Sequence, residues 1–67
     1  MKYVIRVDWE KLGYEYIKNR RHRYGFYPTT GNINKAKQFS RRKSAENRLA
    51  TIKQMRGYPS PEIIEVE

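Results

Sequence analysis

The cationic side chains of this chain gather in the middle of its sequence, and their density points to the binding of phosphate groups. Residues 18–43 hold nine Lys or Arg residues and no Asp or Glu. Residues 1–17 have three basic and three acidic residues, and residues 44–67 have three basic and four acidic ones. The whole net charge of +8 therefore belongs to this block. Because like charges repel one another, such a block favours a partner of opposite sign.

Two clusters in this block, together with aromatic neighbours, are the predicted nucleic-acid contacts. A basic turn at residues 20–23 can lie along phosphates, and aromatic rings beside it can stack on bases. Residues 41–43 fall at the start of a predicted helix, where free backbone amides and cations together favour a bound phosphate. The alternative for both clusters is a set of solvated charges that keep the protein soluble. The predicted nucleic-acid-binding residues are Arg20, Arg21, Arg23, Tyr24, Tyr27, Arg41, Arg42 and Lys43.

The sequence offers little for catalysis or for metal binding. His22 is the only histidine, and it lies among three arginines. A small toxin-type ribonuclease, which uses Arg, Lys, His and Tyr around a phosphate, is the enzymatic alternative. However, the sequence shows no catalytic pair of carboxylates, no nucleophile with a base and no phosphate-binding glycine loop. We therefore expect no enzymatic activity, no metal and no cofactor.

Length and composition predict one small basic domain over residues 1–67. The chain has no cysteine, so it has neither a disulfide nor a thiolate metal site, which favours a reducing cytoplasm. The first residues alternate apolar and charged side chains, unlike a signal peptide, and no segment is long and apolar enough to span a membrane.

Alternating apolar residues predict a first hairpin, made of strands at residues 2–9 and 14–19 around a turn at Gly13. A third strand at residues 24–29 is possible, although Pro28 would confine it to its end or to a sheet edge. A loop at residues 30–32 follows. Asn32 is the expected N-cap of a single helical turn at residues 33–37.

A helix and a last strand complete the predicted fold. Ser40 or Ser44 is the expected N-cap of the main helix, whose apolar stripe ends before Gly57, Pro59 and Pro61. Residues 62–67 form the last strand. The expected class is α+β, with a three- or four-stranded antiparallel or mixed sheet packed on one helix. The stripe consists of Ala45, Leu49, Ile52 and Met55, and the expected core of Tyr3, Ile5, Val7, Leu49, Ile52 and Ile64.

Residues 36–46, with Phe39 followed by a short basic stretch and Ala45-Glu46, carry a family resemblance. The pattern resembles short uncharacterised proteins of phages and other mobile elements of Gram-positive bacteria, as do the opening KYVIRV and the closing EIIEVE. It is also similar, more weakly, to the arm-type DNA-binding domain of tyrosine-family integrases, in which a three-stranded sheet backed by a helix enters the DNA major groove. Here Arg41 replaces that family's usual Thr, and the strand at residues 62–67 has no counterpart.

The expectation that follows is a small accessory or regulatory protein of a mobile element that binds nucleic acid, DNA rather than RNA. The main alternative is a protein-binding inhibitor or modulator of a host enzyme, whose basic face docks on an acidic surface. An open sheet edge leaves either a monomer or an edge-strand homodimer.

Overall fold

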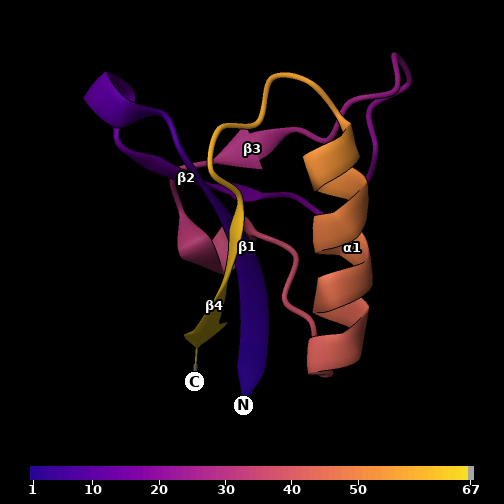
Figure 1. Ribbon diagram of the computed structural model, residues 1–67. Helices are drawn as coiled ribbons and strands as arrows, with labels where there is room; N and C mark the ends of the chain where they lie inside the picture. The colour runs from indigo at the N-terminus through magenta and orange to yellow at the C-terminus, as the bar shows by residue number, and fades with distance from the viewer. Residues whose placement is uncertain (67) are drawn as a thin grey trace.

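A computed structural model describes residues 1–66 and has an α+β architecture, in which one helix covers a sheet (Figure 1). Within these residues a four-stranded antiparallel sheet has the order β3-β2-β1-β4. The predicted fold class is confirmed. The helix is α1 (Arg42–Gln54), and the strands are β1 (Lys2–Asp8), β2 (Tyr14–Ile17), β3 (Thr29–Thr30) and β4 (Glu62–Val66).

Two short 3₁₀ turns occupy the connections. The turn η1 (Glu10–Leu12) joins β1 to β2. Gly13 follows it with a positive φ of 86°, a conformation that glycine adopts readily, as expected for the turn predicted at this residue. The turn η2 (Ile33–Lys35) lies on the side of the sheet away from α1 (Figure 1). The Asn32 side chain accepts a hydrogen bond from the Asn34 N–H at 2.9 Å, which confirms Asn32 as its N-cap.

The core lies between α1 and the inner face of β1. Its fully or almost fully buried side chains include Ile5 and Val7 from β1, Ile17 from β2 and Ile52 from α1. Leu49 packs against them but stays half-buried. Phe39 is held at the edge of β1, where its N–H and C=O exchange hydrogen bonds of 2.8 and 2.9 Å with Tyr3. The apolar stripes of strand and helix therefore meet as expected.

One predicted core residue is wrong, because β4 presents Ile63 rather than Ile64 to the helix. The register pairs Ile5 with Ile63 and Val4 with Ile64. Directly opposed residues of an antiparallel pair point to the same face, so Ile63 joins the core beside Ile5. Ile64 lies on the outer face with Val4.

The predicted third strand is also displaced. Residues 24–28 form a loop, and β3 comprises only the two residues Thr29–Thr30, of which the second was expected in a loop. Pro28 has no N–H for a ladder, and Gly25 adopts a φ of 93° that turns the chain. Its register of Tyr16 with Thr30 and Ile17 with Thr29 fixes β3 at the edge of the sheet.

Neither predicted serine is the N-cap of the helix. Its N-cap is Arg41, and within residues 1–66 no side chain caps the first turn. The first helical residues are therefore Arg42 and Lys43 themselves. At the other end α1 stops at Gln54, and Gly57 takes a φ of 96° in the turn that leads to β4.

The outer face of the sheet carries charges of both signs. The Arg6 guanidinium lies 4.0 Å from the centroid of the Tyr14 ring and is hydrogen-bonded to Glu62. This hydrogen bond raises the pKa of Arg6 above its usual range. Asp8 and Lys2 lie in the same alternating set of β1, so this face has no excess of cations. Hence the positive charge of the protein lies elsewhere.

Candidate nucleic-acid interface

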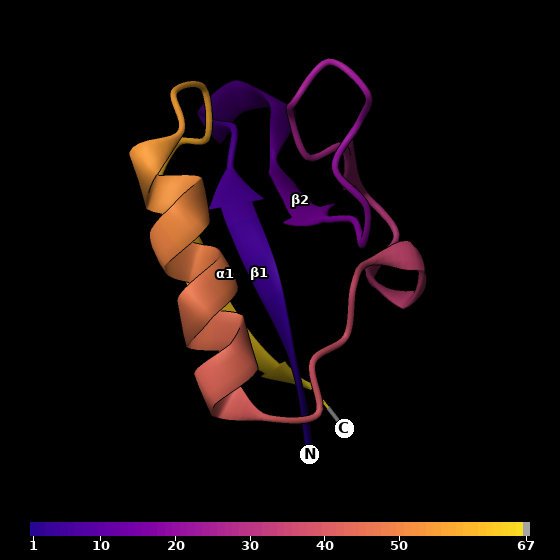
Figure 2. The same cartoon turned by 90° about the vertical axis from the view of Figure 1, so that its right-hand side faces the viewer.

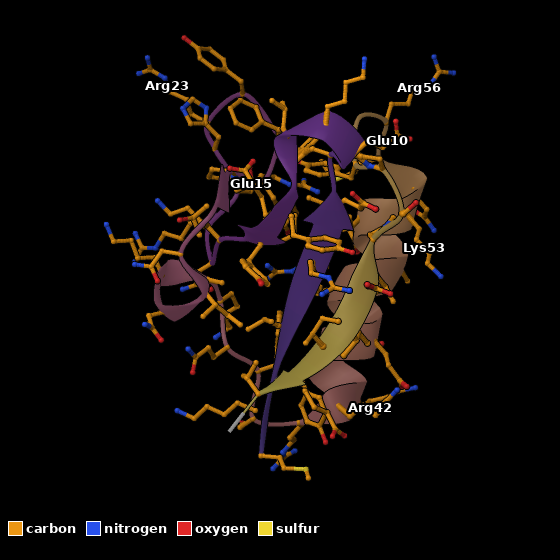
Figure 3. The ribbon with its side chains drawn as sticks, turned by 90° about the vertical axis from the view of Figure 1, so that its left-hand side faces the viewer. Glu10, Glu15, Arg23, Arg42, Lys53 and Arg56 are labelled. Carbon is orange, nitrogen blue, oxygen red and sulfur yellow. The ribbon has the colours of Figure 1, made fainter. Side chains whose placement is uncertain are left out.

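The two predicted cationic clusters lie at opposite ends of the molecule. Figure 3 shows Arg23 at the tip of the loop between β2 and β3 and Arg42 at the other end, beside the start of α1. The 13-residue helix that separates them is about 20 Å long at 1.5 Å per residue. The eight predicted site residues therefore form two sites, not one surface.

The loop at residues 18–28, here called the basic loop, is built as an extension of the β2–β3 hairpin (Figure 2). The Lys18 N–H donates to the Pro28 carbonyl at 2.8 Å and closes its base. Nearer the tip, the Gly25 N–H donates to the His22 carbonyl at 2.8 Å. Only glycine adopts the φ of 93° at position 25 without strain. Backbone hydrogen bonds thus hold the loop that presents the arginines.

Aromatic rings alternate with cations at the loop tip. The rings of His22 and Phe26 stack with centroids 4.5 Å apart and planes 11° apart. The Tyr24 ring lies 5.0 Å from His22 and 5.1 Å from the Arg23 guanidinium, and the Tyr24 side chain is 74% exposed. Since Phe26 is also 44% exposed, the tip offers accessible π faces beside positive charge.

Two contacts hold the His22 side chain at the loop tip. Its Nδ1 accepts a hydrogen bond from the Tyr24 N–H at 3.2 Å, while its ring stacks on Phe26. In the part of the chain that the structure describes, no group of three or more His, Cys, Asp and Glu side chains could hold a metal ion.

Tyr27 occupies a different position from Tyr24. It is half-buried against the core, and two guanidinium groups lie over its ring, Arg48 at 4.5 Å and Arg21 at 5.2 Å from the centroid. Arg48 also donates a hydrogen bond to the Asn19 carbonyl at 3.4 Å. The helix thus adds to the loop a cation that the sequence did not single out. Arg48 follows the charge-dense block, so only its position on the helix face reveals it.

An aromatic cavity of about 430 Å³ opens between the basic loop, the end of α1 and the turn before β4. Trp9, which follows β1, contributes to its wall, and its indole N–H is buried without a hydrogen-bond partner among residues 1–66. The sequence did not indicate this cavity, because its walls come from three separate segments. Its lining residues are Trp9, Phe26, Tyr27, Pro28, Thr29, Met55, Arg56, Gly57 and Tyr58.

Tyr58 fastens the loop to the rest of the molecule. Its hydroxyl accepts a hydrogen bond from the Tyr27 N–H at 2.8 Å and donates one to the Tyr27 carbonyl at 2.7 Å. These two bonds are part-buried and join residues 31 positions apart in the sequence. They fix one wall of the aromatic cavity against another.

Replacement of Tyr58 with phenylalanine should therefore destabilise the protein. The change leaves one backbone donor and one acceptor of Tyr27 without their partners, at a cost of about 1–3 kcal/mol. Urea unfolding followed by circular dichroism measures this loss. Tyr14→Phe is the matched control, because Tyr14 is 52% exposed on the outer face of the sheet. Equal stability of Y58F and wild type would contradict the bonded arrangement.

The cluster at the start of α1 is partly neutralised. Arg42 lies 3.5 Å from a Glu46 carboxylate oxygen and 3.9 Å from one of Glu65. Arg41 and Lys43 are exposed and flank it. Among residues 1–66 the salt bridges involve only the cations Arg6 and Arg42, so the arginines of the basic loop have no carboxylate within 4.0 Å. The loop is thus the less compensated of the two clusters.

Comparison with known proteins adds no relative to this description. No family model, no curated protein and no solved structure matches the chain. Within the described residues, no helix is long and apolar enough to cross a membrane.

Proposed function

We propose that this protein binds nucleic acid and that the basic loop is its main contact. The observation that carries the proposal is the loop itself, where Arg20, Arg21 and Arg23 have no carboxylate partner within residues 1–66. The exposed rings of Tyr24 and Phe26 belong to the same loop. Cations of this kind gain most from a phosphate, because no internal salt bridge must first be broken. Arg48 and Arg56 add positive charge at the same end.

The cluster of Arg41, Arg42 and Lys43 is the proposed second contact. It combines cations with the uncapped N–H groups at the start of α1, a combination that favours phosphate. Its competing pairs with Glu46 and Glu65 make it the weaker of the two. A strand that reaches both clusters must follow the length of the helix.

The biological setting rests on the sequence resemblance alone. We propose an accessory or regulatory protein of a phage or other mobile element, acting in the cytoplasm and with DNA as the favoured ligand. The free edge of β4, at one side of the sheet, is compatible with a monomer or with an edge-strand homodimer.

Binding measured against salt concentration tests the proposal. If the six cations of the two clusters contact phosphates, log K should fall with log salt with a slope of about −5 for a duplex and about −4 for a single strand. Gel shifts or fluorescence anisotropy with duplex DNA, single-stranded DNA and structured RNA measure these slopes. A protein without salt-sensitive affinity for any of the three would instead point to the acidic protein surface as the partner of the basic face.

A further inference from the structure

We propose that the aromatic cavity receives one unpaired nucleobase, so that the ligand of this protein is single-stranded nucleic acid or a strand with a base turned out of its duplex. This inference rests on the proposed function and names the chemical class of its ligand. Its first support is the shape and composition of the cavity. Side chains of Trp9, Phe26, Tyr27 and Tyr58 line about 430 Å³, which lies in the range of small-ligand sites.

The cavity is an open feature of the folded chain rather than a gap in its core. Trp9, Tyr27, Met55 and Tyr58 pack against the core on their inner sides, which fixes the walls. Phe26 lies outside that cluster and is 44% exposed. Its ring stacks on His22. An exposed ring on one side of preorganised aromatic walls is suited to a flat ligand.

The charge around the cavity selects the kind of flat ligand. Arg56 belongs to the lining, Arg21 and Arg48 lie over the Tyr27 ring, and Arg23 projects from the same end of the molecule (Figure 3). Aromatic cages also bind quaternary ammonium groups, but these arginines would repel such a cation. A nucleobase attached to a phosphate chain matches both features, since its ring stacks while its phosphates meet the arginines.

The base must be unpaired to enter. Inside a duplex both faces of a base are covered by its neighbours, so a stacking pocket can accept only a base that has left the stack. The arginines of the basic loop are placed to hold the flanking phosphates. The loop therefore contributes the salt-dependent part of binding, and the cavity contributes a salt-independent preference for single strands.

The single tryptophan provides a direct readout, because Trp9 is part of the cavity wall. Oligo(dT) and oligo(rU) of ten nucleotides each, and a blunt DNA hairpin, are titrated into the wild-type protein at two salt concentrations. The two single strands distinguish DNA from RNA as the source of the base. We expect at least one of them to quench the Trp9 emission on binding, whereas the hairpin should bind more weakly and leave the emission unchanged.

Phe26→Ala separates stacking from charge. It should weaken single-strand binding about tenfold or more while leaving the slope of log K against log salt unchanged, because it removes a ring and no cation. Phe26→Tyr should restore affinity, and Phe26→Leu should not, which distinguishes a π contact from apolar bulk. Tyr14→Ala is the aromatic control, since Tyr14 lies on the outer face of the sheet, away from the cavity lining.

Failure of this inference differs from failure of the proposed function. If strands bind with a steep salt slope but Trp9 is not quenched, or if Phe26→Ala weakens hairpin and single strands alike, the cavity is not a base site and the proposed function stands. If the circular dichroism spectrum of Phe26→Ala differs from that of the wild type, the single-strand affinities of Phe26→Leu and Phe26→Tyr are compared instead. Equal affinities of these two variants would then contradict the base site. If no probe binds, both proposals fall.

Discussion

Removing the charge of the basic loop should abolish most nucleic-acid affinity, whereas the same loss of charge at the start of α1 should have a smaller effect. The loop variant carries Arg20, Arg21 and Arg23 replaced by Gln. Loss of three phosphate contacts should reduce the slope of log K against log salt by about two to three units. Affinity at about 0.1 M salt should then fall by about 100- to 1000-fold, for every sequence alike.

The control for this prediction is matched in charge. Replacing Arg41, Arg42 and Lys43 by Gln also removes three positive charges, but from the opposite end of the helix. Its slope should change less, because Arg42 already has Glu46 and Glu65 as partners. Equal losses in the two variants would mean that the ligand spans both ends. A larger loss in the helix variant would overturn our choice of the loop.

Both charge variants should remain folded. The loop arginines are exposed, and Arg21 and Arg23 gain at most about 0.5–1 kcal/mol each from the tyrosine rings beneath them. In the helix variant, removing cations from the first turn relieves repulsion with the helix dipole and offsets the loss of two exposed salt bridges. Melting temperatures close to that of the wild type are expected, and a large drop would show a structural role for the cluster.

Replacement of Ile52 with alanine should have the largest effect on stability. Ile52 is fully buried and belongs to the cluster that joins α1 to β1. Truncation of a buried isoleucine costs about 2–5 kcal/mol. A domain of this size has a total stability of only a few kcal/mol, so the variant should be largely unfolded at room temperature. Circular dichroism and Trp9 emission during urea titration measure the loss.

Two leucines calibrate this result. Leu12 is 85% exposed on η1, so Leu12→Ala should leave the midpoint of unfolding nearly unchanged. Leu49→Ala should fall between the two, because Leu49 packs against the core while remaining half-buried. A cooperative Ile52→Ala variant that melts like the wild type would mean that α1 does not pack on the sheet through this face.

The predicted nucleic-acid residues divide according to how local their signals are. The concentration of arginine and lysine in residues 18–43 is visible in the sequence, and so is the aromatic character of the loop. Neither shows that Glu65 lies near Arg42. Neither shows that Tyr27 is half-buried and covered by Arg48 from the helix, while Tyr24 is 74% exposed. These differences depend on which segments meet in space, and residues 42 and 65 meet only after folding.

Sequence patterns alone predict the α+β class, the first hairpin, the helix with its buried Ile52, the cap at Asn32 and the location of the charge. These follow from local periodicity and local hydrogen bonding. The folded structure was needed to show that Ile63 rather than Ile64 faces the helix, because a one-residue change of register reverses every side chain of a strand. It alone also assembled the aromatic cavity, whose walls lie up to 49 positions apart, from Trp9 to Tyr58.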